Sequence, residues 1–233
     1  MKIALFGYGR MGKMIEKTAL DRAHSIVAKI DLDTTEIDYS EMDVAIDFST
    51  PDAAYDNIVA CLNNGVPIIS GTTGWLHRYE DAVALCRKKQ GAFIYASNFS
   101  LGVNVFFELN AYLAVMMKNL KQYQVSMEEV HHTQKLDAPS GTAITLAEAI
   151  IAKTDYGAWK LNEAPENEIA IRSKRIGQVP GTHTVGYDSA VDSIEIKHTA
   201  HNREGFALGA VVAAEFIVGK TGIFTMKDVL NLG

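Results

Sequence analysis

Cysteine is scarce in this chain of 233 residues, which contains only Cys61 and Cys86. Both lie in segments with a helical pattern, so they indicate a reduced cytoplasmic protein and not a disulfide framework. Long hydrophobic runs are lacking too, and no uninterrupted apolar stretch approaches the roughly 20 residues of a membrane-spanning helix. The apolar start runs into a glycine turn too early for a secretory signal peptide. We therefore expect a cytoplasmic protein with no membrane partner.

Positive charge is in deficit as well. The 22 lysine and arginine residues are outnumbered by 28 aspartate and glutamate residues, which gives a net charge of −6. This balance offers no basic surface of the kind that nucleic acid or an anionic membrane requires. An anionic substrate therefore needs a local cluster of cations. The composition, 48% hydrophobic and 21% charged, is typical of a soluble globular protein with a sizeable core.

The first hundred residues alternate short apolar segments with helical patterns. Five segments are expected to be strands: Lys2–Phe6, Ser25–Ile30, Asp43–Phe48, Val66–Ser70 and Ala92–Ala96. Strands that are separated by single helices form a parallel sheet through right-handed crossovers. Their nearly continuous apolar character agrees with burial on both faces of the sheet. The pattern predicts an α/β fold with a Rossmann-type parallel sheet.

The pattern changes after Asn98, where a long apolar helix is followed by a strand, another helix and a run of strands. The expected elements are the helices Val103–Leu120, Ser140–Ala152 and Phe206–Val218 and the strands Gln122–Val130, Ile169–Ser173, His183–Tyr187 and Ser193–His198. A short tail containing Met226–Leu230 follows. We therefore place a domain boundary near residue 100.

A glycine-rich turn, Gly7-Tyr8-Gly9-Arg10-Met11-Gly12, follows the first expected strand and opens a helix. In the pattern G-x-G-x-x-G the first glycine permits the tight turn, the second lets the backbone approach a pyrophosphate, and the third lets helix pack on strand. Asp31 ends the second strand, where an acid accepts hydrogen bonds from ribose hydroxyls. The alternative is a structural turn with a chance acid nearby. The combination favours a dinucleotide cofactor.

Asp31 also bears on the choice between NADH and NADPH. A carboxylate at this position repels a 2′-phosphate, and Leu32 supplies no guanidinium to offset the repulsion. The sequence therefore predicts that NADH is preferred over NADPH, unless Arg10, Lys13 or Lys29 reaches the phosphate.

Two later loops lie at the carboxyl ends of expected strands, where parallel sheets bind their ligands. Gly71-Thr72-Thr73-Gly74 follows the fourth strand, and Ala96-Ser97-Asn98-Phe99 follows the fifth. Backbone groups of these loops are placed to contact the nicotinamide carboxamide and its ribose. Ordinary turn chemistry explains the same residue types equally well, because Gly, Thr, Ser and Asn are common in turns.

The most informative stretch is 128–143, where two histidines and a lysine precede a helix start. His131 and His132 come at the end of an expected strand, and Lys135 lies in the loop beyond. Either Asp137 or Ser140 is placed to cap the helix, so that the N–H groups of the following Gly141 and Thr142 point outward to an anion. Imidazoles and an ammonium supply protons near neutral pH. The cluster suits a small acidic substrate that is protonated during the reaction.

Each member of this cluster has an ordinary structural explanation when taken alone. A single histidine at a strand end is commonly a satisfied structural group, and Lys135 by itself would be a solvated surface charge. Zinc is not expected, because the chain has neither paired cysteines nor the H-E-x-x-H spacing. The residues taken together favour a reactive site without a metal.

The segment Glu129-Val-His-His-Thr-Gln-Lys-Leu-Asp-Ala-Pro-Ser-Gly-Thr-Ala143 resembles the signature H-H-x-x-K-x-D-A-P-S-G-T-A of the 4-hydroxy-tetrahydrodipicolinate reductase (dihydrodipicolinate reductase) family. The resemblance extends over nearly the whole chain. Its other segments are Gly9-Arg-Met-Gly12, Asp47-Phe48-Ser49, Gly71–Gly74, Ser97-Asn98-Phe99-Ser100, Val179-Pro180-Gly181-Thr182, His198-Thr-Ala-His-Asn-Arg203 and Met226-Lys-Asp-Val-Leu230.

The resemblance implies an NAD(P)H-dependent enzyme of lysine and diaminopimelate biosynthesis. Its reaction would reduce 4-hydroxy-tetrahydrodipicolinate, with loss of water, to tetrahydrodipicolinate. His131 would be the acid/base residue and Lys135 a proton donor, while His132, Gly141 and Thr142 would bind the dicarboxylate. The cofactor would be bound by Gly7, Tyr8, Gly9, Arg10, Met11, Gly12, Asp31, Gly71, Thr72, Thr73, Ala96, Ser97, Asn98 and Phe99.

The resemblance also implies the domain organisation. Residues 1–100 and 206–233 would form the dinucleotide-binding domain, because the last helix returns to the first domain in this family. Residues 101–205 would form a smaller α+β domain with a mixed sheet, for substrate binding and oligomerisation. Four chains would join through these sheets into a homotetramer.

Two other functions stay open on the sequence. One is an NAD-dependent amino-acid dehydrogenase of the aspartate type, which keeps the first domain and uses a similar imine. The other is a non-catalytic module that senses NAD(H). The segment from His131 to Thr142 argues against both.

Overall fold

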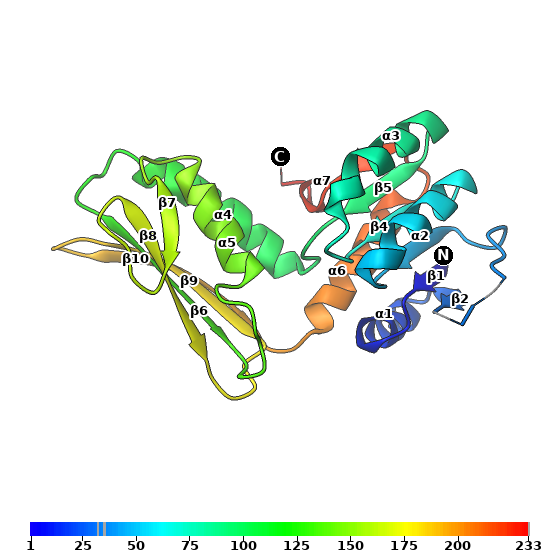
Figure 1. Ribbon diagram of the computed structural model, residues 1–233, viewed down its shortest axis with the longest axis horizontal. Helices are drawn as coiled ribbons and strands as arrows, with labels where there is room; N and C mark the ends of the chain where they lie inside the picture. Colours follow the sequence, from blue (N-terminus) through cyan, green and yellow to red (C-terminus); the bar gives the residue numbers. More distant parts are fainter. Residues whose placement is uncertain (32, 35, 233) are drawn as a thin grey trace. The chain divides into compact units, whose positions relative to one another are not determined.

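A six-stranded parallel sheet forms the centre of the first of two structural units in the computed structural model (Figure 1). Its strands are β1 (Lys2–Phe6), β2 (Ser25–Ile30), β3 (Val44–Asp47), β4 (Ile68–Ser70), β5 (Ala92–Tyr95) and β11 (Gly222–Phe224). They lie in the order β11-β5-β4-β3-β1-β2, and every pair is parallel. This order brings the carboxyl ends of β1, β3, β4 and β5 to one edge of the sheet, where parallel sheets bind ligands.

Helices cover both faces of this sheet. The helices are α1 (Arg10–Asp21), α2 (Pro51–Asn63), a 3₁₀ turn η1 (Leu76–Arg78), α3 (Tyr79–Lys89), α6 (Glu204–Ile217) and α7 (Met226–Leu230). Ile3 and Leu5 of β1 pack into the core with α1 and α6, whereas Ala4 and Phe6 pack into the opposite core with α2 and α3. Alternate residues of a strand point to opposite faces, so a strand that is apolar throughout is buried on both sides.

The second unit contains a mixed five-stranded sheet. Its strands are β6 (Gln124–His131), β7 (Ala158–Leu161), β8 (Glu168–Arg175), β9 (Gly181–Asp188) and β10 (Ser193–Ala200), in the order β10-β9-β6-β8-β7. The pairs β6/β8 and β7/β8 are parallel, whereas β9 is antiparallel to β6 and β10. The helices α4 (Leu101–Met117) and α5 (Gly141–Ile151) pack against this sheet around a third core. A Rossmann-like parallel sheet and a separate mixed sheet confirm the predicted fold class.

The structure describes residues 1–31, 33–34 and 36–232. Leu32, which entered the argument on cofactor choice, lies outside the described residues. The chain divides into two units, one comprising Met1–Leu101 and Glu204–Gly233 and the other Gly102–Arg203. Within the described residues, no helix is both long enough and apolar enough to cross a membrane.

Two strands escaped the sequence analysis. β11 has three residues and extends the parallel sheet by pairing with β5, and β7 has four residues that are all at least partly exposed. Strands this short carry no periodic signal, because their pairing depends on a sheet edge formed elsewhere in the chain. The helical segment between β4 and β5 begins with the 3₁₀ turn η1 and continues directly as α3.

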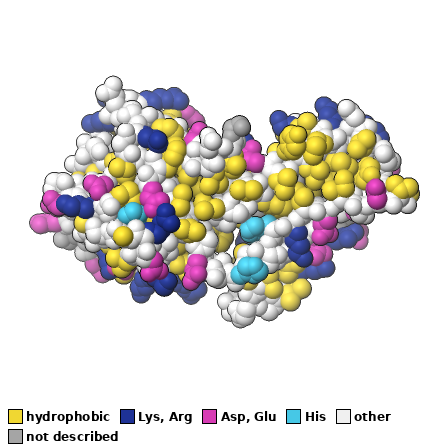
Figure 2. Space-filling model, turned by 180° about the vertical axis from the view of Figure 1, so that it is seen from behind, with side chains coloured by type: hydrophobic (Ala, Val, Ile, Leu, Met, Phe, Trp, Pro, Cys, Tyr) yellow, Lys and Arg dark blue, Asp and Glu magenta, His cyan; other side chains and the backbone are white. Residues whose placement is uncertain are grey.

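One face of α4 carries exposed apolar side chains. Hydrophobic residues gather over this helix in the view of Figure 2. The exposed members are Val105, Leu109, Tyr112, Val115 and Met116. Exposed apolar patches of this kind are typical of surfaces that contact other molecules.

Candidate active site

The glycine turn after β1 has the geometry of a phosphate-binding turn. Gly7 has φ = +86°, and a Cβ atom there would lie 2.3 Å from the carbonyl oxygen of Phe48. A Cβ atom on Gly12 would lie 2.4 Å from the carbonyl oxygen of Gly7, so this glycine lets α1 approach β1. At the exposed Gly9, the N-cap of α1, a Cβ atom would meet no described atom within 4 Å. The backbone is therefore open to a ligand at the N-terminus of α1.

Asp31 and Gly7 line one small hollow of about 100 Å³, beside the end of β1. Its other lining residues are Ile30, Ser49, Thr50, Ala53 and Asn57. The fold thus brings the glycine turn and the acid at the end of β2 together, as a pyrophosphate and an adenosine ribose require. The residues present fit a dinucleotide on this edge of the sheet.

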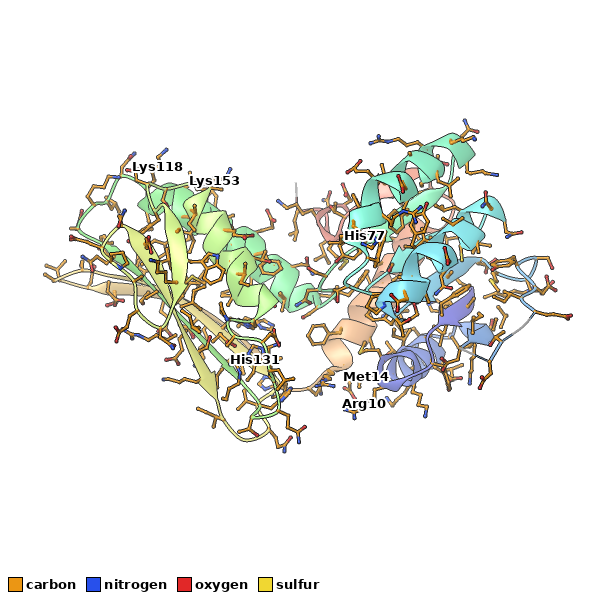
Figure 3. All side chains as sticks on the ribbon, in the orientation of Figure 1. Arg10, Met14, His77, Lys118, His131 and Lys153 are labelled. Carbon is orange, nitrogen blue, oxygen red and sulfur yellow. The ribbon has the colours of Figure 1, made fainter. Side chains whose placement is uncertain are left out.

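Lys29 and Lys13 both lie beside Tyr8 of the glycine turn. Lys29 Nζ lies 2.6 Å from a carboxylate oxygen of Glu16 and donates a hydrogen bond of 3.0 Å to the Tyr8 hydroxyl. Tyr8 in turn donates to Glu16, and Lys13 Nζ lies 5.9 Å from the centre of the Tyr8 ring. Arg10 is exposed at the first position of α1 (Figure 3). The charge of Lys29 is thus already paired with Glu16.

A buried carboxylate, which the sequence analysis gave no role, organises the loops at this edge. Asp47 is fully buried and accepts hydrogen bonds from Ser49 Oγ at 2.6 Å, Asn57 Nδ2 at 3.1 Å, Ser70 Oγ at 2.8 Å and Thr72 Oγ1 at 2.8 Å. Four donors compensate the loss of hydration of this group. The sequence does carry a signal for this cluster, because the neighbouring apolar strands β3 and β4 each end in a polar residue, Asp47 and Ser70.

The two loops expected to contact the nicotinamide each combine a buried side chain with an exposed one. Thr72 is buried, its hydroxyl donates to Asp47, and its carbonyl accepts a hydrogen bond from Trp75 Nε1 at 2.8 Å. Phe99 is buried in the core, with its ring centre 5.8 Å from that of Phe48. Thr73 and Ser97 are exposed. The side chains of Thr72 and Phe99 therefore support the loops and leave ligand contacts to backbone and exposed groups.

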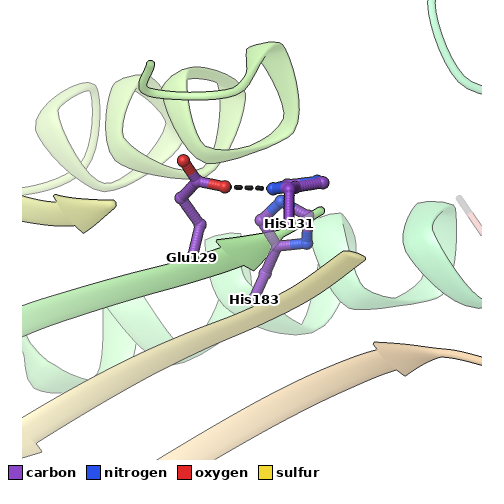
Figure 4. A group of neighbouring side chains, drawn as sticks. All are labelled: Glu129, His131 and His183. Atoms are coloured by element: carbon purple, nitrogen blue, oxygen red, sulfur yellow. Dashed lines mark hydrogen bonds and ion pairs between the residues drawn. The ribbon is translucent and has the colours of Figure 1, made fainter. Parts of the chain in front are cut away.

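In the second unit, His131 is the last residue of β6 and contacts Glu129 on the same face of the strand (Figure 4). A Glu129 carboxylate oxygen makes a short contact with Nδ1 of His131. His183 of β9 lies directly across from Glu129 in the sheet, and its ring centre is 5.1 Å from that of His131. All three side chains are buried. The sequence analysis missed Glu129, although its place two residues before His131 in a strand puts both on one face.

The side chain of Arg175 links β6 to the loop 132–140 that follows this strand. It stands opposite His131 in the parallel pair of β6 and β8. Its Nη1 donates to Glu129 Oε1 at 2.8 Å, its Nη2 donates to the carbonyl oxygen of Asp137 at 2.6 Å, and its Nε donates to that of Lys135 at 3.3 Å. Arg175 was also missed, because nothing in the sequence links β8 to this loop.

The loop 132–140 holds Lys135 in an ion pair. Lys135 Nζ lies 2.7 Å from both carboxylate oxygens of Asp137, and its hydrogen bond lowers the pKa of that carboxyl. Asp137 is therefore a partner of the lysine, whereas Ser140 is the N-cap of α5 and accepts a hydrogen bond from Ala143 N at 3.3 Å. The sequence had left the choice of cap between these two residues open.

The groups expected to bind carboxylates surround the start of α5. Gly141 is the exposed first residue of the helix, and a Cβ atom there would meet no described atom within 4 Å. Thr142 and His132 are partly buried. The Ser140 hydroxyl lies 3.0 Å from Nε2 of His183, so the helix start is tied to the histidine pair. This end of the unit presents cations, imidazoles and a helix N-terminus, the groups that an acidic substrate needs.

Glu129, His131 and His183 are close enough to be weighed as a metal site. One ligand atom of each lies within 4.8 Å of the others. Arg175, however, already places a positive charge 2.8 Å from Glu129, and the other carboxylate oxygen contacts His131. A second cation would meet the repulsion of the guanidinium, so the geometry favours a hydrogen-bonded pair.

His183 predicts a pH dependence of stability. Burial lowers its pKa to about 4, with the charge of His131 contributing. The unfolded histidine, with a pKa of about 6.5, binds a proton between these values while the folded one stays neutral. Acidification from pH 6.5 to 4 should therefore lower the free energy of unfolding, by up to about 3 kcal/mol from this residue.

Urea unfolding at pH 7 and pH 4.5 measures this loss. His183→Gln keeps a polar partner for Ser140 and should reduce the difference between the two pH values, whereas the exposed His77→Gln should leave it unchanged. Burial also lowers the pKa of His198, which contributes with the same sign. An equal loss in wild type and His183→Gln would contradict the assignment.

Comparison with known proteins decides the family. A family model described as "Dihydrodipicolinate reductase, N-terminus" matches residues 1–99, and one described as "Dihydrodipicolinate reductase, C-terminus" matches residues 102–230. The chain belongs to the dihydrodipicolinate reductase family. The predicted resemblance is thereby confirmed, and the chain is an oxidoreductase of that family.

Named relatives agree with the dihydrodipicolinate reductase models. A 4-hydroxy-tetrahydrodipicolinate reductase of Christiangramia forsetii is 59% identical over 99% of this chain and 98% of its own length. One of Alkaliphilus metalliredigens is 34% identical over 100% of both. The dipicolinate-bound dihydrodipicolinate reductase structure from Paenisporosarcina sp. TG-14 aligns with a TM-score of 0.77 and 22% identity over 97% of each chain, a likeness of fold.

Proposed function

We propose that this chain reduces 4-hydroxy-tetrahydrodipicolinate, with loss of water, to tetrahydrodipicolinate in lysine and diaminopimelate biosynthesis. NADH or NADPH would supply the hydride. The observation that carries the proposal is the convergence of His131, Lys135 and the N-terminus of α5 at one end of the second unit. The 59% identity to a protein of this name supports the choice of substrate.

The proposed substrate site divides its tasks between proton transfer and anion binding. His131 acts as the acid/base residue and Lys135 as a proton donor. His132 and the backbone of Gly141 and Thr142 hold the carboxylates. Reduction of a conjugated imine builds negative charge toward nitrogen and leaves a carbon to be protonated. An ammonium and an imidazolium stabilise that charge and supply the protons.

The proposed cofactor site belongs to the first unit. It comprises Gly7, Tyr8, Gly9, Arg10, Met11, Gly12, Asp31, Gly71, Thr72, Thr73, Ala96, Ser97, Asn98 and Phe99. A bound nicotinamide supplies a hydride. The glycines admit the pyrophosphate to the N-terminus of α1, and Asp31 accepts hydrogen bonds from the ribose hydroxyls. The hydrogen-bonded Asp47 keeps the loops after β3 and β4 in place.

A coupled assay tests the function. The unstable imine precursor is generated in situ, and the loss of NADH absorbance is followed after the purified protein is added. Turnover that depends on the precursor supports the proposal. Oxidation of NADH with the imine of aspartate instead would favour the amino-acid dehydrogenase, and NADH binding without any turnover would favour a sensing module.

The cofactor preference is a separate prediction. The Asp31 carboxylate repels a 2′-phosphate, and Lys29, the nearby cation, is paired with Glu16 at 2.6 Å. We expect kcat/KM to be higher with NADH than with NADPH. The substitution Asp31→Asn should bring the two kcat/KM values closer together. The control is Asp33→Asn, on an exposed residue outside the hollow. A preference for NADPH of about tenfold or more, a difference of about 1.4 kcal/mol, would overturn the prediction.

We further propose a cytoplasmic homotetramer joined through the mixed sheets of the second units. The helices α4 and α5 cover one face of that sheet, and alternate residues of its strands point to the opposite face. Light scattering of the purified protein checks the assembly, since a tetramer has four times the mass of the 25.5 kDa chain. A monomer at micromolar concentration would contradict it.

A further inference from the structure

We propose that Glu129 is a positioning residue for His131. The Glu129 carboxylate holds the imidazole ring by its Nδ1–H and leaves Nε2 to exchange the proton with the substrate. The inference rests on the proposed function and deepens it. Glu129 is fully buried and contacts His131 Nδ1 directly (Figure 4). A buried carboxylate aimed at a histidine sets its orientation and tautomer in many acid–base sites.

The ionisation of Glu129 decides which nitrogen of His131 carries the hydrogen. Burial by itself raises the pKa of Glu129, but the hydrogen bonds with His131 and Arg175 outweigh it and lower the pKa to about 2. The carboxyl is therefore ionised at neutral pH and can only accept hydrogen bonds. Since it contacts Nδ1, that nitrogen is the donor. Nε2 then holds the proton in the imidazolium and the lone pair in the neutral ring.

The space around Nε2 is shaped by Gly181, the first residue of β9. A Cβ atom on Gly181 would lie 3.1 Å from Nε2 and 3.4 Å from Cδ2 of His131. Absence of a side chain thus keeps the working nitrogen uncovered on that side. A methyl group at 181 would press on the ring and disturb its hydrogen bond to Glu129.

Arg175 fixes Glu129 from the other side. Its guanidinium binds Oε1 of Glu129 at 2.8 Å and also the carbonyl oxygens of Lys135 and Asp137. One side chain therefore sets both the carboxylate that holds His131 and the loop that carries Lys135. The two proposed proton donors share this support although they lie on a strand and in a loop.

The charged groups that face His131 come from every neighbouring element. Glu129 is on its own strand, Arg175 on β8 and His183 on β9, and Lys135 and Asp137 are in the following loop. His183 is neutral at pH 7 because burial lowers its pKa to about 4. Glu129 is thus the anion in direct contact with the ring.

Steady-state kinetics of the variant Glu129→Gln test the proposal, and the variant Glu128→Gln is the control. Glu128 is the next residue on β6, and it forms an ion pair of 2.6 Å with Lys174 instead. For Glu129→Gln we expect kcat to fall about 100-fold with KM for NADH unchanged, because a neutral amide holds the Nδ1–H less firmly than the carboxylate does. The pH profile of kcat should also change, because a neutral group replaces the carboxylate beside the ring. Glu128→Gln should change neither quantity.

An activity of Glu129→Gln within twofold of wild type, with the same pH profile, would overturn the proposal. A loss of kcat without any change in the profile would mean that Glu129 has a merely structural role. Thermal unfolding of both variants shows whether the fold persists, since Glu129→Gln leaves the charge of Arg175 without its carboxylate.

Nitrogen NMR of the histidine rings decides the tautomer in the wild-type protein, so the result does not depend on the folding of Glu129→Gln. The His131 signals are assigned by their loss in His131→Gln. Protonation at Nδ1 in the neutral ring is the expected result, and protonation at Nε2 alone would overturn the proposal. This measurement needs no turnover. An inactive wild-type protein with the Nδ1 tautomer would therefore refute the proposed function and leave the role of Glu129 in holding the ring intact.

Discussion

Replacing His131 with alanine should lower kcat by roughly two to four powers of ten, the range of a general acid–base residue. The dissociation constant for NADH should change little, because the proposed cofactor site lies on the first unit. Steady-state kinetics and a fluorescence titration with NADH measure the two quantities. The substitution removes the ring that contacts the buried Glu129, so a moderate loss of thermal stability is also expected.

The exposed His77 on η1 provides the control for this substitution. His77→Ala removes a ring of the same type, and turnover should stay at the wild-type level. If His131→Ala kept wild-type turnover, His131 would have no part in proton transfer. A parallel loss of NADH affinity would indicate that the substitution disturbs more than the substrate site.

Replacing Lys135 with alanine should lower kcat by roughly two to three powers of ten and raise KM for the dicarboxylate together. In the proposed mechanism this cation both donates a proton and attracts the carboxylates of the substrate. The substitution also leaves the Asp137 carboxylate, which lies 2.7 Å from Nζ, without the lysine as its partner. Initial rates over a range of precursor concentrations separate the two effects.

Lys135→Arg distinguishes charge from proton donation. Arginine keeps the positive charge but does not release a proton at neutral pH. We expect KM near the wild-type value and kcat close to that of Lys135→Ala. Lys174→Ala is the control, because Lys174 is exposed and pairs with Glu128 on β6. Wild-type activity of Lys135→Ala would place this lysine among ordinary surface charges.

The residues His131 and Lys135 belong to one hydrogen-bonded network that contains Arg175. Its guanidinium bonds to Glu129, which contacts His131, and to the carbonyl oxygen of Lys135. Residues that share such a network do not contribute independently. The combined loss in His131→Ala/Lys135→Ala should therefore be smaller than the product of the two single losses.

Much of the candidate site could be predicted because its residues are close in sequence. His131, Lys135 and Gly141 fall within eleven positions, and a single strand, loop and helix start bring them to one end of the unit. The glycine turn after β1 is local in the same way, because its geometry depends on backbone freedom at Gly7 and on close packing at Gly12. Local chemistry of this kind is written in consecutive residues.

The partners of these residues could not be predicted, because strand pairing supplies them. Arg175 stands opposite His131 in the pair of β6 and β8, and His183 stands opposite Glu129 in the pair of β6 and β9. Neither register follows from the pattern of a single strand. The Asp47 carboxylate likewise gathers donors from β4, α2 and two loops.

The sequence by itself determined the class of fold, the glycine turn and the His-His-x-x-Lys segment, because periodicity and turn chemistry act over a few neighbouring residues. Only the tertiary structure decided the cap of α5, the pairing of Lys135 with Asp137 and the burial of Glu129 beneath His131. These outcomes depend on which side chains meet when distant strands align. A buried charge such as Glu129 is stable only where the fold supplies its partners, and here Arg175 and His131 do so.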